Sequence, residues 1–148
     1  MIKTLTVYLS AFLIVLATSA ANAMTIEMLN KDSNGNKMIY SEEIAKVNVG
    51  DTITWVPTSK GHNVEMIAGP DGAELPAKSK NGKEVSMTFE VPGIYYYWCT
   101  PHKGMGMIGL VVVGDDTSNA EAIAKAKALG KSKKKLQHLL HMVQGHNH

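Results

Sequence analysis

One stretch indicates both the fold and the chemistry of this chain of 148 residues: Ile94-Tyr95-Tyr96-Tyr97-Trp98-Cys99-Thr100-Pro101-His102-Lys103-Gly104-Met105-Gly106-Met107. Its apolar first half predicts a strand that ends at the only cysteine of the sequence. Side chains of a strand alternate between its two faces, so Tyr95 and Tyr97 should share the face of Cys99, and the residues between them should point the other way. If the Cys99 face is the core, a rigid strand holds the thiol away from water.

The second half of the stretch predicts a metal site. His102 follows Cys99 after two residues, so both side chains can reach one ion from a single turn. Two histidines, one cysteine and a weak methionine are the ligands of a blue-copper electron-transfer centre, which suits both Cu(I) and Cu(II). The second histidine should be His62, because the folded body contains no other. Spacing alone leaves the axial position open between Met105 and Met107, and a buried cysteine without metal is the alternative.

The N-terminus predicts export. Lys3 precedes an apolar run over residues 5–17, and Ala21-Asn22-Ala23 is a small-x-small cleavage site, so residues 1–23 read as a secretory signal peptide. The run is shorter than the ~20 residues that span a bilayer, which disfavours an uncleaved anchor. Cleavage leaves residues 24–148, one ordinary domain whose single cysteine has no disulfide partner within the chain.

Charge is divided unevenly along the chain. Residues 24–124 carry 8 lysines and 13 acidic residues, whereas residues 125–148 carry 6 lysines and no acidic residue. The sequence contains no arginine. Arginine supplies most bidentate contacts to phosphates and bases, so its absence disfavours a nucleic-acid reader.

Short alternating segments predict an all-β domain over residues 24–116. Gly, Pro and Asn turns separate the segments, as in an antiparallel sandwich or barrel. The segments are 25–29, 38–40, 45–49, 52–56, 62–66, 85–90, 95–99 and 107–113, with a long loop over 67–83.

Residues 117–144 predict two helices. Ser118-Asn119-Ala120-Glu121 matches a capping box, Gly130 is a candidate C-cap, and a second apolar stripe begins after Ser132. We expect both helices to pack on the sandwich, with a partner-binding arm as the alternative. In the last helix and in the tail over 145–148, four histidines could hold a second, weak metal ion, although a frayed polar terminus is the simpler reading: His138, His141, His146 and His148.

Several motifs resemble the pseudoazurins, periplasmic cupredoxins with one copper ion. These are Leu29-Asn30-Lys31, Gly50-Asp51-Thr52, Lys60 to Glu65, Val91-Pro92-Gly93, and Cys99 to His102 followed by Met105-Gly106-Met107-Ile108. The resemblance implies an eight-stranded Greek-key sandwich with two C-terminal helices. It also implies copper ligands at His62, Cys99, His102 and Met107, and a backbone hydrogen bond from Asn63 to the Cys99 sulfur. Trp98 and the pair Lys103-Gly104 depart from the family pattern near the expected docking face.

The resemblance further implies a monomeric, one-electron carrier rather than an enzyme. Electrons would pass through the exposed edge of His102 to a nitrite reductase or a c-type cytochrome. An apolar patch would surround this edge, with Pro101 and Met105 as its principal candidates and Gly104 and Met38 beside them. Lysines around the patch would steer an acidic partner: Lys31, Lys60 and Lys103, then Lys78 and Lys80.

Other readings remain open at the level of sequence. An amicyanin-like carrier would use Met105 as its axial ligand. A periplasmic copper-binding or delivery protein would use an exposed, exchangeable site. A multicopper enzyme is disfavoured because the chain is too short for a second cupredoxin domain.

Overall fold

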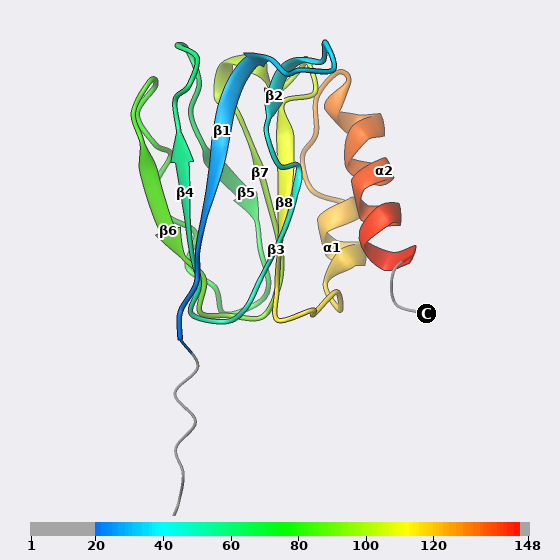
Figure 1. Cartoon of the computed structure of the whole chain (residues 1–148). Coiled ribbons are helices and arrows are strands. Elements are labelled where there is room, and N and C mark those ends of the chain that lie inside the picture. Colours follow the sequence, from blue (N-terminus) through cyan, green and yellow to red (C-terminus); the bar gives the residue numbers. More distant parts are fainter. Residues whose placement is uncertain (1–19, 146–148) are drawn as a thin grey trace, which may run out of the picture.

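The computed structural model describes residues 20–145, which form two four-stranded sheets and two C-terminal helices (Figure 1). One sheet has the order β2-β1-β4-β6 and the other has the order β3-β8-β7-β5. The strands are β1 (Ala23–Lys31), β2 (Lys37–Tyr40), β3 (Ile44–Val47), β4 (Thr52–Val56), β5 (Glu65–Ala68), β6 (Val85–Thr88), β7 (Gly93–Trp98) and β8 (Ile108–Val113). A 3₁₀ turn covers Thr100–His102, and the helices are α1 (Ala120–Ala124) and α2 (Ser132–Gly145).

The sheets are mixed, which corrects the expectation of purely antiparallel pairing. β1 pairs parallel with β4, placing Ile26 opposite Trp55, and β3 pairs parallel with β8, placing Ile44 opposite Leu110. The other pairs are antiparallel. The parallel pairs join strands that are not consecutive in sequence. Between β1 and β4, and between β3 and β8, the chain crosses to the other sheet and returns, so the second strand can run in the same direction as the first.

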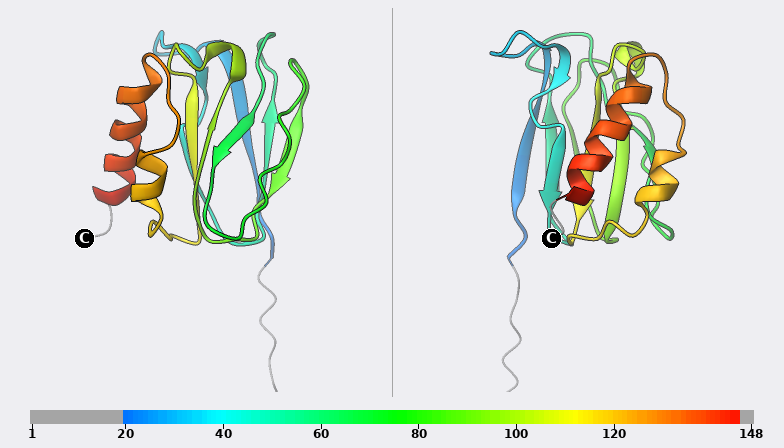
Figure 2. Two further views of the ribbon diagram at one scale, coloured as in Figure 1. Left: turned by 180° about the vertical axis from the view of Figure 1, so that it is seen from behind. Right: turned by 90° about the vertical axis from the view of Figure 1, so that its right-hand side faces the viewer.

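β7 lies between two hydrophobic cores, and all six of its residues are buried. Tyr95, Tyr97 and the following Cys99 face the inside of the sandwich, whereas Tyr96 and Trp98 belong to a second cluster under the helices. The predicted alternation is confirmed. The apolar stripe of α2 completes the second cluster. The right-hand view in Figure 2 shows both helices covering the sheet that contains β7 and β8. The stripe consists of Leu136, Leu139, Leu140 and Val143.

The predicted capping box does not form. α1 is a single turn that begins after Asn119, and the Asn119 side chain makes no capping hydrogen bond. Its carboxamide instead accepts from the Ile94 N–H (2.9 Å) and donates to the Ile94 carbonyl (2.8 Å). The predicted C-cap is also wrong, since α1 ends at Ala124 and Gly130 lies just before α2. The Ser118 N–H, which the glutamate of a capping box would bind, instead donates to Asp116 Oδ1 (2.8 Å), and Glu121 pairs with Lys125.

The strand expected over residues 62–66 begins later, at Glu65. Asn63 and Val64 are held by side-chain hydrogen bonds from outside the sheet, including Val64 N–H to Ser79 Oγ (2.8 Å). His62 therefore lies in the loop before β5. Within residues 20–145 no helix is long and apolar enough to cross a membrane, while residues 1–19 of the predicted signal peptide and residues 146–148 of the tail lie outside the described range.

Candidate metal centre

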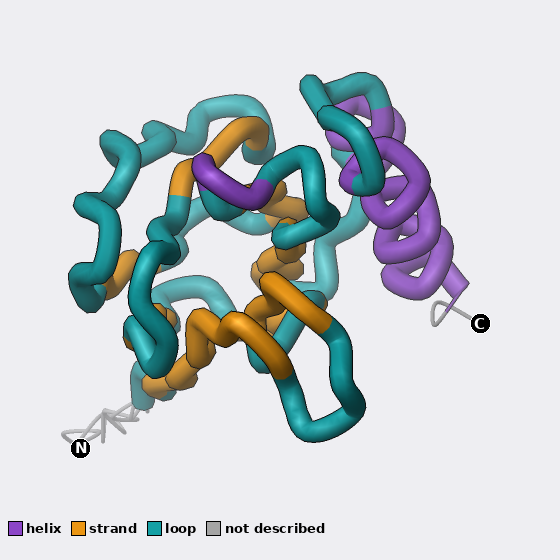
Figure 3. Tube along the Cα trace, turned by 90° about the horizontal axis from the view of Figure 1, so that it is seen from above, coloured by secondary structure: helices purple, strands orange, loops and turns teal. Residues whose placement is uncertain are grey.

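Three segments bring His62, Cys99 and His102 to one point. His62 comes from the loop before β5, Cys99 ends β7, and His102 ends the 3₁₀ turn, which Figure 3 shows at one end of the sandwich. The Nδ1 atoms of the two histidines are 3.1 Å apart. The Cys99 sulfur lies 3.4 Å from Nδ1 of His102 and 3.7 Å from Nδ1 of His62. Among the described residues, this is the only cluster of three or more histidine, cysteine, aspartate or glutamate side chains that could hold a metal ion.

The triangle has the dimensions of a trigonal metal centre. With metal–nitrogen bonds of about 2.0–2.1 Å and a metal–sulfur bond of about 2.3 Å, the nitrogens would be about 3.5 Å apart and nitrogen and sulfur about 3.8 Å apart. The observed separations are within about 0.4 Å of these estimates. The residues present therefore fit a metal ion without rearrangement of the chain.

Burial favours the neutral forms of the three groups. It raises the pKa of the Cys99 thiol, although backbone N–H groups of Asn63 and His102 oppose the rise. Burial lowers the pKa of both His62 and His102, and the neighbouring His102 charge adds to the effect at His62. Neutral imidazoles can ligate directly, and a bound metal deprotonates a thiol outright.

Met107 and Met105 differ sharply in environment. Met107 is fully buried and packs in the same core cluster as Cys99. The Cys99 N–H also donates to the Met107 carbonyl (2.9 Å). Met105 is 50% exposed, so it lies at the rim of the site.

Hydrogen bonds join the two ligand loops behind the site. The Asn63 Oδ1 accepts from the Thr100 N–H (2.8 Å), and its Nδ2 donates to the Thr100 hydroxyl (3.0 Å). The Tyr40 hydroxyl donates to the Asn63 carbonyl (2.7 Å). The residues next to His62 and Cys99 are therefore fixed to each other, which presets the spacing of the ligands.

Sequence reasoning missed Asn30 as a site residue. Its Oδ1 lies 2.8 Å from Nε2 of His62, so the ring donates from Nε2 and presents the Nδ1 lone pair to the site. In the sequence, Asn30 is marked only by its place in the motif Leu29-Asn30-Lys31. Its role depends on the end of β1 lying beside the His62 loop, a contact that no local pattern encodes.

Polar and charged side chains surround Trp98, the residue before Cys99. Its indole N–H donates to Glu65 Oε2 (2.6 Å), which also accepts from the Thr100 hydroxyl (2.7 Å). The Lys103 ammonium lies over the Trp98 ring, 5.1 Å from its centroid, in a cation–π contact. Trp98 and Lys103, which lie on either side of Cys99 and His102 in sequence, thus contact each other.

The remaining predicted residues have varied settings. Three of the residues expected around the docking patch are partly buried: His102, Lys103 and Met38. The others are exposed: Lys31, Lys60, Lys78, Lys80, Pro101, Gly104 and Met105. His138 and His141 are exposed on α2 and line different cavities, and within the described residues they join no metal cluster.

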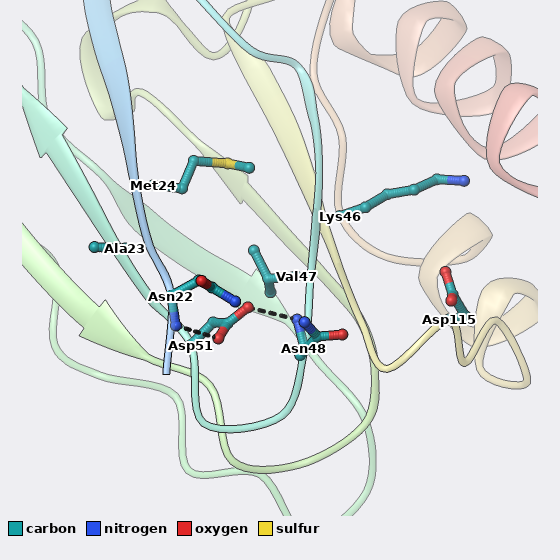
Figure 4. A pocket seen from close by; sticks show the side chains of 8 residues that line it. All are labelled: Asn22, Ala23, Met24, Lys46, Val47, Asn48, Asp51 and Asp115. Atoms are coloured by element: carbon teal, nitrogen blue, oxygen red, sulfur yellow. Dashed lines mark hydrogen bonds between the residues drawn. The ribbon is translucent and has the colours of Figure 1, made fainter. Parts of the chain in front are cut away.

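Figure 4 shows a cavity at the end of the sandwich opposite the metal centre, where buried Asp51 accepts from the N–H groups of Asn22 (2.7 Å) and Asn48 (2.8 Å).

Comparison with known proteins identifies relatives of this chain. The family model of copper-binding proteins of the plastocyanin/azurin family matches residues 26–114. A putative pseudoazurin from Rhizobium leguminosarum is 42% identical over 82% of this chain and 82% of its own length. Pseudoazurin from Paracoccus pantotrophus is 40% identical over 86% of this chain and 88% of its own.

Solved structures agree with the sequence relatives. A pseudoazurin from Sinorhizobium superposes with a TM-score of 0.78 at 38% identity, covering 83% of this chain and 97% of its own. Native pseudoazurin from Hyphomicrobium denitrificans gives 0.75 at 40% identity, covering 81% and 97%. The chain therefore belongs to the plastocyanin/azurin family of copper-binding proteins and, within it, to the pseudoazurins, which are electron carriers and not enzymes.

Proposed function

We propose that His62, Cys99 and His102 would hold one copper ion and that Met107 would supply its fourth, weaker ligand. The observation that carries this assignment is the triangle of Nδ1, Nδ1 and Sγ atoms, which has the size of a trigonal metal site. Copper held there supplies one-electron chemistry between Cu(I) and Cu(II). The chain contributes a rigid, mostly dry cage, in which the Asn63–Thr100 hydrogen bonds and the His62–Asn30 contact fix the ligands.

Burial favours Met107 over Met105 as the axial ligand. A weak thioether contact inside a dry site requires a side chain that is itself buried, and Met107 meets this condition whereas Met105 is half exposed. Met105 instead suits a contact surface, since methionine adapts to different apolar partners. The amicyanin-like assignment therefore has less support.

His102 is the electron port in this proposal. It is the only one of the three clustered ligands that is not fully buried, and it is flanked by exposed Pro101 and Met105. A partner that covers this small apolar patch would come within reach of the imidazole edge. Small contacts of this kind release quickly, as a mobile carrier requires.

Charge around the port favours an acidic redox partner in the periplasm. Lys31 and Lys60 are exposed, and Lys103 is held over Trp98. We assign the partner to the class of nitrite reductases or c-type cytochromes, reached after export directed by residues 1–23. A copper-delivery role has less support, because Cys99 and His62 are fully buried and so are poorly placed for exchange with a partner's ligands.

The visible spectrum with one equivalent of Cu(II) tests the copper site. We expect an intense orange-red band that bleaches with ascorbate and returns on oxidation. Cys99→Ser should abolish the band, whereas removal of residues 145–148 should leave the band and the copper stoichiometry unchanged. A weak absorption that depends on the tail would show that copper sits on exposed imidazoles, and the blue-copper assignment would be wrong.

Reversal of docking charges tests the steering role. We expect Lys60→Glu combined with Lys103→Glu to slow electron transfer to an acidic partner at low salt and to flatten its dependence on ionic strength. Lys46→Glu is the control for Lys60→Glu, because Lys46 lines the cavity at the other end of the sandwich. Equal rates and salt slopes for the double variant and the unmodified protein would refute steering by these lysines.

A further inference from the structure

The start of α2 binds the outer side of the ligand loop. Three backbone carbonyls of this loop, between His102 and Met107, accept hydrogen bonds from one short segment. The Ser132 hydroxyl donates to the carbonyl of Lys103, the Lys131 N–H donates to that of Gly104 (3.0 Å), and the Lys135 ammonium donates to that of Gly106 (2.9 Å). Ser132 is fully buried in this contact.

Two glycines allow the close approach. Gly130 has a φ of +52°, and a Cβ atom at this position would collide with the Gly104 carbonyl. Gly106 has a φ of +96°, a conformation that residues with a side chain rarely adopt, and a Cβ atom there would lie 3.6 Å from the stem of Lys135. Both positions require the conformational freedom of glycine, so the contact is specified by the backbone as well as by side chains.

The contact with Glu43 and the ligand loop explains why a lysine stands at position 135. A lysine in the first turn of a helix opposes the helix dipole. Lys135 is nevertheless only 25% exposed, and it forms an ion pair with Glu43, which is 26% exposed. Glu43 lies just before β3, and its carbonyl accepts from the Leu110 N–H of β8 (2.8 Å). Lys135 therefore links the ligand loop to the edge of the second sheet.

We propose that Ser132 and Lys135 are positioning residues for the metal centre, forming an outer brace on residues 103–106. Among the described residues, the hydrogen bonds and ion pair of these two side chains go to Lys103, Gly106 and Glu43 and not to a ligand side chain. They fix the loop that carries His102 at one end and Met107 at the other, so the copper assignment made above underlies their effect on the metal. Because coupling is reciprocal, metal binding should in turn stabilise the first turn of α2.

Amide hydrogen exchange of the metal-free protein tests the brace directly. The amides of Met105 and Met107 both donate to the His102 carbonyl and report on the loop. We expect Lys135→Met to speed their exchange by about ten-fold or more, since a hydrogen bond from a charged donor is lost. The matched control is Lys134→Met, which removes the same charge from the same turn at an exposed position. Lys135→Arg should restore most of the protection.

Copper retention is the second readout. We expect Lys135→Met and Ser132→Ala to release Cu(I) to a chelator faster than Lys134→Met does, and to shift the charge-transfer band and the reduction potential. Unchanged exchange in Lys135→Met, or an equal change in Lys134→Met, would overturn the brace. A slower exchange of the α2 first turn on metal binding would support it. The exchange test needs no metal, so a missing blue band would reject the copper assignment without deciding the brace.

Discussion

The carboxylate of Glu65 shows how one side chain can support a site that it does not touch. It accepts hydrogen bonds from Trp98 and Thr100, the two neighbours of Cys99 in sequence. Burial acts to raise the pKa of Glu65, but these hydrogen bonds, with the charges of Lys78 and Lys103, outweigh it and hold the pKa below its ordinary value. The ionised form is therefore favoured by folding.

A Glu65→Gln substitution should destabilise the metal-free protein in a pH-dependent way. A carboxylate with a lowered pKa in the folded state stabilises that state above its unfolded pKa of about 4.3, and this contribution is lost as the pH falls through the folded value. We expect a loss of about 1–2 kcal/mol in unfolding free energy at pH 7. The difference should shrink at pH values below about 4.

Urea unfolding at several pH values measures this difference. Glu74→Gln is the control, because Glu74 is an exposed glutamate of the neighbouring loop. A Glu65→Gln deficit that stays constant down to pH values near 3 would mean that the side chain acts through its shape and not through its charge.

At the scale of secondary structure, the docking of α1 depends on one asparagine. A helix of five residues has little stability of its own, and Asn119 ties its start to β7 by two hydrogen bonds to Ile94. We expect Asn119→Ala to lower the free energy of unfolding by about 2 kcal/mol. Ser118→Ala should change it by less than about 0.5 kcal/mol, since Ser118 is exposed.

Comparison of the two variants by urea unfolding distinguishes a tertiary tie from a capping box. If Ser118→Ala proved the more damaging, the local motif would be the main determinant of α1. The copper band of both variants should remain, because neither residue contacts the ligand loops through any described hydrogen bond.

Local patterns in the sequence predict some of these elements well. The alternation from Tyr95 to Cys99 has a period of two, which is a property of any strand, so both faces of β7 could be assigned. Cys99 and His102 could be paired because they share a turn. His62 could be assigned only by elimination, since nothing near it in sequence marks it as a ligand.

Features set by non-local contacts could not be predicted. The parallel pairs β1–β4 and β3–β8 depend on which sheet each strand joins. Asn30 acquires its role only when β1 lies beside the His62 loop, and the Asn119 side chain binds β7 instead of capping α1. In each case the partner is at least 25 residues away in sequence, beyond any local pattern.

At the scale of the whole molecule, β7 and β8 join the metal centre to the helices. Every residue of both strands is buried, with one face in the sandwich and the other under α1 and α2. Loss of the helices would expose the outer face of these strands. The helices should therefore be part of the same cooperative unit as the site.

Leu140→Ala tests whether the molecule unfolds as one unit. Leu140 is 3% exposed in the helix-covered core, so the substitution should cost about 2–4 kcal/mol, as it would inside the sandwich. Met142→Ala is the control, because Met142 is 41% exposed on the same helix. Urea unfolding followed by far-UV ellipticity, by tryptophan fluorescence and by the copper band should give one shared midpoint for each variant. An earlier loss of helical signal in Leu140→Ala, with the copper band intact, would show that α2 is a separate unit and that its contacts with the ligand loop are not required to hold the metal.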